Sequence, residues 1–558
     1  MYLLDEGIQN AKALIIDGNT SSRSLLAAQL RDLGVGQVRM VGRVKEARLI
    51  LEHQSYDIVL CDAQIDGADS GGQDLLDELR RVGLLPYATV FVMMTNEATY
   101  ARVAEAAEAA LDAYLIKPHT SASLAERLTS ARHRKRVLKD IFDAIERQDF
   151  ETGAKLCLQR FESRARYWLY AARIGAELLL RLGKYAEAQQ MYEAIVAAKT
   201  VPWAKLGVAR AQLAGGSQAS ARRTLEDLVG ELPGYADSHD LLGHLQMEQG
   251  DLAQALQTYQ TATTLTPGCL LRLQRCGSLA YYAGQREQAM ELLERATAQG
   301  LRSKLFDMLS LMLVGFMRFD RGERKALNYA FDALNAAIWR LPPSKRLQRF
   351  ERAFAALQAL MDRQLPQAQA IAQELDGQAD QGDFDLEAAT LLVALWMRLV
   401  RQGLPWDVAR PALERLGLRY CTSKASTEVL VASTDGDEQA EPLLRDCHQR
   451  IFGIAETAVR HSIRSNAVAA VELLLQQGES TRNAKLIDMA ALVLKRHAAK
   501  FDDPAHYEQQ ALTLQERYVL PMGWRGLLRG RDSGAVALRV QAEPATLSLP
   551  TAPNGSQG

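Results

Sequence analysis

Short apolar runs alternate with helix-like stretches over the first 130 residues of the chain. The apolar runs are ALII (from residue 13), QVRMV, YDIVLCD, ATVFVMMT and DAYLIKP. Stretches with apolar residues at helical spacing follow them, namely SSRSLLAAQLRDLG, VKEARLILEHQ, LLDELRRVG, YARVAEAAEAA and SLAERLTSARH. Regular alternation of strand and helix predicts a doubly wound α/β fold, a five-stranded parallel sheet with helices on both faces.

Polar side chains stand at the ends of four of the five predicted strands. Asp17 follows the first strand, Asp62 ends the third, Thr95 ends the fourth and Lys117 follows the fifth. Parallel strands bring their carboxyl ends to one edge of the sheet, and ligand sites in such folds form there. We therefore expect two carboxylates, a hydroxyl and an ammonium group to converge at this edge.

The strand pattern stops near residue 140, and helical periodicity continues alone. Small residues then recur 34 positions apart: Gly243 with Gly277, and Gly250 with Gly284. Small side chains at such positions let two antiparallel helices approach closely. A period of about 34 residues with two helices per unit predicts an all-α helical-repeat solenoid.

Pattern and composition divide the chain into five segments. We expect an α/β domain over residues 1–130, a helical linker over 131–140 and helical repeats over 141–300. The repeat fades after residue 300, so 301–528 is expected to be an irregular helical, repeat-like region. Small residues and proline dominate residues 529–558, which is typical of a disordered tail.

Charge excludes one broad class of function. The chain has 66 basic and 67 acidic residues, whereas nucleic-acid binders usually carry a basic excess. The basic run ARHRKRVLK at 131–139 is the local exception, and a solvated helix face joining two domains explains it better than a nucleic-acid site. We therefore expect no nucleic-acid partner.

The distribution of cysteines and the hydropathy of the chain favour a soluble protein in a reducing compartment. The six cysteines are scattered and include no CxxC pair, so we expect neither a disulfide framework nor a zinc site. The first residues, MYLLDEGIQN, lack the basic and apolar regions of a signal peptide. The longest apolar stretch, which starts at Leu305, is about 15 residues long and too short to span a bilayer. We expect a soluble, cytoplasmic protein without a membrane partner.

The first 130 residues resemble a response-regulator receiver domain of the CheY-like kind. The resemblance covers about residues 11–130 and rests on LIIDGNTSSR, YDIVLCDAQIDGADSGG, VFVMMTNE and DAYLIKPHTSASL. It implies that Asp62 accepts a phosphoryl group from a histidine kinase or a phosphotransfer protein. It further implies that Thr95 and Lys117 contact the phosphoryl oxygens, and that Tyr114 is an aromatic switch that turns inward with Thr95.

The same resemblance implies a magnesium site. Its ligands would be Asp17, Asp62 and the backbone carbonyl of Gln64, and Mg²⁺ favours such hard oxygen ligands. This sequence departs from the family pattern at Gly18, where a second acidic residue usually follows Asp17. The loop after Asp62 also departs from the pattern, and its Asp66 and Asp69 are further carboxylates. Weaker metal binding and slower phosphorylation are the expected consequences.

Residues 168–300 resemble tetratricopeptide (TPR) repeats. The segment DLLGHLQMEQGDLAQALQTYQTATTLTP shows nearly the full pattern, and residues 141–163 match a degenerate first unit. The resemblance implies a concave groove that binds segments of other proteins.

Two functions from different classes follow. The first is a phosphorelay response regulator with a TPR protein-binding output, in which phosphorylation masks or releases the repeat groove or alters homodimer formation. The alternative is a phosphorylation-independent scaffold with a degenerate pseudo-receiver, motivated by Gly18. The GxSxG, GxxxxGK[ST], HExxH and strand-linked GxGxxG motifs are absent from the sequence, so we expect no catalytic residue and no enzyme.

Overall fold

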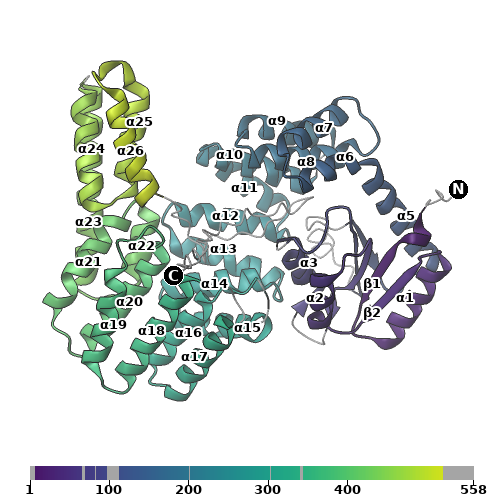
Figure 1. Ribbon diagram of the computed structural model, residues 1–558, viewed down its shortest axis with the longest axis horizontal. Helices are drawn as coiled ribbons and strands as arrows, with labels where there is room; N and C mark the ends of the chain where they lie inside the picture. The colour runs from purple at the N-terminus through teal and green to yellow at the C-terminus, as the bar shows by residue number, and fades with distance from the viewer. Residues whose placement is uncertain are drawn as a thin grey trace, which may run out of the picture.

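The computed structural model describes residues 7–65, 70–81, 83–96, 112–199, 201–301, 303, 305–339, 343–464 and 466–519. An α/β domain comes first, and a long all-helical region follows it (Figure 1). The expected tail at 529–558 and the helix expected over YARVAEAAEAA lie outside these residues.

The first domain is built on a sheet of five parallel strands in the order β2-β1-β3-β6-β7. Its strands are β1 (Lys12–Ile16), β2 (Gln37–Val41), β3 (Ile58–Asp62), β6 (Val90–Thr95) and β7 (Ala113–Ile116). The predicted doubly wound fold is confirmed. A small antiparallel pair, β4 (Gln64–Ile65) with β5 (Ser70–Gly71), follows β3.

Helices cover both faces of this sheet because strand residues alternate between them. Ala13 and Ile15 belong to the core shared with α1 and α5, whereas Leu14 and Ile16 belong to the core shared with α2 and α3. These helices are α1 (Thr20–Asp32), α2 (Val44–His53), α3 (Gly72–Arg81) and α5 (Ser121–Val137), and a 3₁₀ turn, Ile8–Asn10, precedes β1.

The helical region continues from α5 as antiparallel pairs. The first part comprises α6 (Lys139–Glu146), α7 (Phe150–Glu162), α8 (Trp168–Arg181), α9 (Tyr185–Ala198), α10 (Pro202–Ala214), α11 (Gln218–Glu231), α12 (Ala236–Glu248), α13 (Leu252–Leu265), α14 (Leu270–Tyr282) and α15 (Arg286–Gly300). The second comprises α16 (Leu309–Asp320), α17 (Arg324–Ile338), α18 (Lys345–Met361), α19 (Leu365–Gly377), α20 (Leu386–Arg401), α21 (Trp406–Tyr420), α22 (Lys424–Ala432), α23 (Ala440–Ile463), α24 (Ala467–Thr481), α25 (Ala484–His497) and α26 (Pro504–Tyr518), with a 3₁₀ turn, Ala498–Lys500.

The turn inside each early pair has the same backbone feature, a residue with positive φ between the two helices. Glycine fills it in five successive pairs, from α8–α9 to α16–α17: Gly183, Gly216, Gly250, Gly284 and Gly322. Glycine adopts this conformation without a steric penalty, which explains its recurrence in the sequence.

Close helix approach within and between the pairs also depends on small residues. A Cβ atom added at Gly243 of α12 would lie 3.1 Å from the ring of Tyr259 on α13. At Gly207 of α10 the added atom would lie 2.3 Å from the ring of Tyr192 on α9. The role predicted for Gly243 is confirmed.

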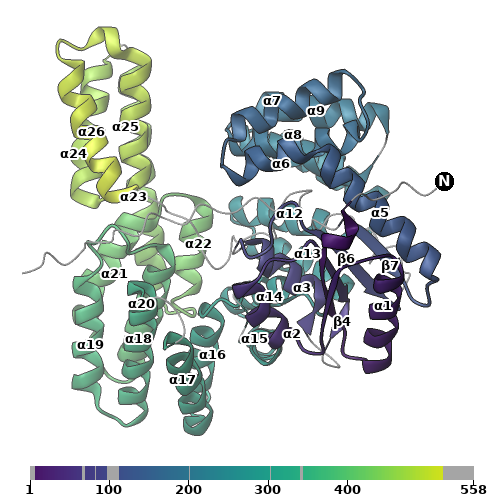
Figure 2. The ribbon, with the colours of Figure 1, turned by 45° about the vertical axis from the view of Figure 1, so that its right-hand side comes forward.

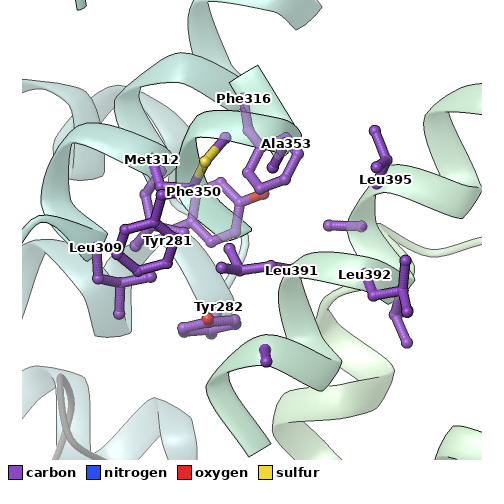
Figure 3. Packing of buried hydrophobic residues seen from close by; sticks show 14 of the residues in the cluster. Tyr281, Tyr282, Leu309, Met312, Phe316, Phe350, Ala353, Leu391, Leu392 and Leu395 are labelled. Atoms are coloured by element: carbon purple, nitrogen blue, oxygen red, sulfur yellow. The ribbon is translucent and has the colours of Figure 1, made fainter. Parts of the chain in front are cut away.

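The later helices fold back onto the earlier ones. Nearly all of α20 is buried, and its leucines pack with residues of α14, α16 and α18, as Figure 3 shows. Tyr282 on α14 lies within hydrogen-bond distance of Thr390 on α20, 3.2 Å between hydroxyl oxygens. One continuous apolar core therefore runs from about residue 247 to residue 447.

The junction between the two parts differs from the expected solvated linker. Helix α5 runs from the sheet domain to α6–α9 (Figure 2) and carries most of the basic run. Lys135 is only 8% exposed; it donates to the carbonyl of Tyr87 at 2.6 Å and pairs with Asp112 at 3.0 Å. The prediction that residues 131–139 form a solvated face is wrong for Lys135, because its side chain is buried between the two parts.

Among the described residues, no helix is long and apolar enough to cross a membrane.

Candidate functional site

Two carboxylates and one ammonium group meet at the carboxyl edge of the sheet. Lys117, just after β7, places Nζ 2.5 Å from Oδ2 of Asp62 and 2.8 Å from Oδ2 of Asp17. Asp17 is fully buried and Asp62 is 9% exposed. The structure thus brings together three of the residues that the strand-end pattern singled out, with the lysine bridging the two acids.

The start of α1 holds Asp17 in place. Its Oδ1 accepts a hydrogen bond from the backbone N–H of Asn19 at 2.7 Å, and its Oδ2 accepts one from the hydroxyl of Ser22 at 2.6 Å. Asn19 also caps α1, since its side chain accepts from the N–H of Ser22. Asp17 is therefore fixed by the helix that follows it as well as by Lys117.

The surroundings of Asp62 are tight on one side. The backbone N–H of Gln64 donates to Asp62 Oδ1 at 3.1 Å. A Cβ atom added to Gly72, at the start of α3, would lie 2.2 Å from the carbonyl oxygen of Asp62. Only glycine lets α3 begin this close to the end of β3.

Thr95 lies on β6, the strand next to that of Asp62, and Tyr114 lies on β7, one strand further out. Strand β6 pairs with β3 and places Met94 opposite Asp62, so buried Thr95 follows directly. On β7, Tyr114 pairs with Met93 and is half-buried against the core on the α2–α3 side. The carbonyl of Thr95 accepts from the N–H of Lys117 at 2.7 Å, which ties the two strand ends together.

Electrostatics favour the charged forms of the bridged pair. Burial raises the pKa of Asp17, but hydrogen bonds from Lys117, Ser22 and Asn19 outweigh it and leave the pKa below the ordinary value. Burial likewise lowers the pKa of Lys117, and its bonds to Asp17 and Asp62 outweigh that effect and leave it raised. Asp17 is therefore a carboxylate and Lys117 an ammonium ion at neutral pH.

The oxygen atoms at this edge suit a hard cation. Asp17, Asp62 and the carbonyl of Gln64 match the preference of Mg²⁺, which keeps several water ligands of its own. Gly18 contributes no carboxylate, and Asp66 and Asp69 lie outside the described residues. Within the described part of the chain, no cluster of three or more His, Cys, Asp or Glu side chains could hold a metal. Asp17 and Asp62 therefore offer Mg²⁺ two carboxylates, and Gly18 adds none.

Sequence reasoning missed two features around this domain. Ser22 is one; its place after an N-cap asparagine in DGNTSS was the available signal. The other is Asp112, which lies 7% exposed before β7 and accepts from the N–H of Phe91 at 2.9 Å. It also pairs with Lys135 and Arg134 of α5. No pattern in the sequence reveals that a strand-start acid and a basic run meet in this way.

Comparisons with known proteins agree with both parts of the fold. The response regulator receiver domain model matches residues 13–129, and the tetratricopeptide repeat model matches residues 236–269. Chemotaxis protein CheY-3 of Vibrio cholerae is 33% identical over 120 residues, covering 22% of this chain and 90% of that protein. Chemotaxis protein CheY of Pseudomonas aeruginosa is 31% identical over 117 residues, 21% of this chain and 92% of that protein.

Solved structures are similar at the level of parts. Response regulator CheY4 of Vibrio cholerae has 21% identity and a TM-score of 0.20, covering 22% of this chain and 98% of that one. The C-terminal part of a TPR repeat-containing protein from Cytophaga hutchinsonii has 15% identity and a TM-score of 0.29, covering 48% of this chain and 98% of that one.

Proposed function

Because the chain belongs to the response-regulator family through its N-terminal receiver domain, we propose that it is a phosphorelay response regulator with a protein-binding TPR output. A histidine kinase or a phosphotransfer protein phosphorylates Asp62. The observation that carries the proposal is the Asp17–Lys117–Asp62 cluster at the carboxyl edge of the sheet.

In the proposed reaction a carboxylate oxygen of Asp62 forms a bond to phosphorus while the bond to the donor breaks. Phosphoryl transfer depends mainly on positioning and on neutralising charge. Lys117 is already 2.5 Å from the acceptor carboxylate and carries a positive charge for the transferred group. Thr95 supplies a hydroxyl for the phosphoryl oxygens, and Tyr114 changes position with it.

Magnesium is the proposed cofactor, held by Asp17, Asp62 and the carbonyl of Gln64. When bound, it supplies positive charge that offsets the charge of the phosphoryl group. Because Gly18 adds no carboxylate, we expect weaker magnesium affinity than an Asp-Asp pair provides.

The receiver and the repeats are in contact, so a conformational change in the receiver can be transmitted to the repeats. Glu78 on α3 is buried; it pairs with Arg48 of α2 at 2.7 Å and accepts from the hydroxyl of Ser303 at 2.9 Å. Ser303 lies between α15 and α16 of the helical region. We propose that phosphorylation alters this contact and thereby the binding of a protein ligand to the repeats or the formation of a homodimer.

A cytoplasmic location completes the proposal. The six cysteines are free thiols and five of them are buried, which suits a reducing compartment. No catalytic function beyond the receiver's own phosphorylation is proposed.

One observation favours the second candidate, a phosphorylation-independent scaffold. Lys117 pairs with both acids directly, and Gly18 contributes no further carboxylate. Calorimetric titration of beryllofluoride, a phosphoryl analogue, in the presence of Mg²⁺ separates the two. The response-regulator proposal predicts binding that Asp62→Asn abolishes; no binding to the natural chain at high Mg²⁺ favours the scaffold.

A further inference from the structure

The first helical pairs have a charge unlike that of the rest of the chain. Residues 131–223 contain eighteen lysines and arginines against nine acids, whereas the remaining residues contain forty-eight against fifty-eight. A nearly neutral protein thus carries a strongly basic segment directly after its receiver domain. Such local excess favours association with anionic partners.

The α7–α8 loop concentrates this charge. Arg164 and Arg166 are exposed, and Arg160 at the end of α7 is half-buried. None of these three arginines pairs with a carboxylate among the residues that the structure describes. Arg160 instead holds the loop, donating to the carbonyl of Arg166 at 3.0 Å and to that of Val137 at 3.3 Å.

Aromatic rings orient the two exposed guanidinium groups. Arg164 lies over the ring of Trp168, with Cζ 3.9 Å from its centroid, and 5.1 Å from the centroid of Phe161. Arg166 lies over Tyr167 at 5.3 Å. A guanidinium that stacks on a ring keeps its N–H edges available for a carboxylate or a phosphate. The rings, in turn, are covered by the arginines and are less available for stacking on nucleic-acid bases.

The backbone of the α7–α8 loop holds the arginines in place in a strained conformation. Arg164 and Tyr167 both have positive φ, 51° and 65°. Two residues other than glycine in this conformation within four positions store strain, which is more common at functional sites than elsewhere. The hydroxyl of Tyr167 is anchored 3.0 Å from Nδ1 of His133 on α5, so the loop is also tied to the receiver's last helix.

A surface groove adjoins the arginines. It has a volume of about 220 Å³, below the ~300–1,000 Å³ of typical small-molecule sites. Its lining residues are Val137, Leu138, Asp140, Ile141, Leu156, Gln159, Arg160, Ser163 and Ala165. Five of these nine are apolar and four are polar or charged, so the groove offers apolar contacts between polar groups, with Arg160 at its wall and Arg164 and Arg166 on the loop beside it.

We propose that the groove and the arginine loop together bind an acidic segment of another protein that carries an apolar anchor residue. The apolar side chain enters the groove between α5–α6 and α7, and flanking carboxylates accept hydrogen bonds from Arg164 and Arg166. Charge complementarity selects an anionic partner, and the apolar contacts of the groove, together with the ring-covered arginines, favour a peptide over a nucleic acid. This surface lies on the junction with the receiver and does not depend on phosphorylation of Asp62.

Fluorescence anisotropy of the full-length chain with a labelled synthetic peptide, Glu-Asp-Glu-Leu-Phe-Glu-Asp-Glu, tests the proposal. We expect saturable binding that weakens as salt is raised, since the contacts are exposed and screened. The double change Arg164→Glu with Arg166→Glu is expected to weaken binding at least about tenfold, or ~1.4 kcal/mol. Lys155→Glu is the matched control, because it reverses an exposed charge on α7 outside the groove lining and should change affinity less than about twofold.

Two further probes separate the alternatives. A peptide with serine in place of Leu-Phe should bind at least about tenfold more weakly if the groove takes the anchor. A labelled single-stranded oligothymidylate tests for a nucleic-acid partner. The proposal is overturned by any of three results: no peptide binding at about 1 mM, equal loss from Lys155→Glu and the double change, or tighter binding of the oligonucleotide than of the peptide. A circular dichroism spectrum matching the natural chain shows that each variant is folded.

Discussion

The ammonium group of Lys117 lies 2.5 Å from Oδ2 of Asp62, at the end of a different strand. The same nitrogen lies 2.8 Å from Asp17, so one lysine holds two buried or nearly buried carboxylates together. The sheet produces this contact, since the three residues follow or end β1, β3 and β7 at the same edge. Lys117 therefore serves stability as well as the proposed phosphoryl transfer.

Replacing Lys117 by methionine should separate these roles. Lys117→Met leaves Asp17 and Asp62 facing each other without a cation, so the free energy of unfolding at pH 7 is expected to fall by about 2 kcal/mol. Urea denaturation measures the loss, and Lys45→Met, an exposed position on α2, is the control with an expected change below ~0.5 kcal/mol. Equal stability of the two variants would show that the bridge contributes nothing.

The junction between receiver and repeats makes a similar prediction. Lys135→Met removes the bonds to Tyr87 and Asp112 and leaves their buried oxygens with fewer donors, at an expected cost of ~1–3 kcal/mol. Limited proteolysis should then cut faster between the receiver and α6. Lys139→Met, at the exposed start of α6, is the control, and cleavage rates that match between the two variants would contradict the account.

Helix packing in the repeats is tested at a pair of glycines. Gly207→Ala places a methyl group against the ring of Tyr192, and overpacking of this kind costs ~1–3 kcal/mol. Gly230→Ala, on the neighbouring α11, has nothing within 4 Å of the new Cβ and should be neutral or stabilising, because alanine favours a helix. A thermal melt of both variants checks the order, and a lower melting temperature for Gly230→Ala than for Gly207→Ala would be inconsistent with the packing described.

Stability should also depend on pH through Glu387. Burial raises the pKa of this carboxyl to about 7 from an ordinary 4.5, against the opposing effect of Arg346. Between these values the folded chain binds a proton that the unfolded chain does not, so this group lowers the free energy of unfolding as pH rises, by at most ~1.4 kcal/mol per pH unit. Below pH 4.5 the effect vanishes, and above about 7 it is complete.

Glu387→Gln removes this titration and provides the check. The stability of the variant relative to the natural chain should increase between pH 5 and pH 7.5, as measured by urea denaturation. A difference that stays constant over this range would show that Glu387 does not titrate there.

The α/β domain could be predicted almost entirely because its signals are local. Each strand is a short apolar run, and strand polarity alone places Asp17, Asp62 and Lys117 at one edge. The contact of Lys117 with Asp17 and the burial of Lys135 could not be predicted, because each depends on side-chain positions across elements far apart in sequence. Ser22 lies only five positions after Asp17, so its support could have been inferred from the local sequence.

In the helical region, the sequence repeat fades after residue 300, whereas the paired helices continue. Helix pairs continue beyond residue 300, but the turn between α18 and α19 has Arg363, not glycine, at its positive-φ position. The α6–α7 turn likewise has Gln148. The sequence therefore shows no repeated glycine at these two turns, although the positive-φ backbone conformation is retained.

We propose that Asp62 accepts a phosphoryl group although Gly18 stands where a second acid is usual. Intact-mass measurement after incubation with acetyl phosphate and Mg²⁺, beside Asp62→Asn, tests it most directly. We expect a gain of one phosphoryl group that is lost in the variant and without metal. No gain in the natural chain, even at Mg²⁺ well above physiological levels and with phosphorylated histidine donors, would contradict it and favour the scaffold.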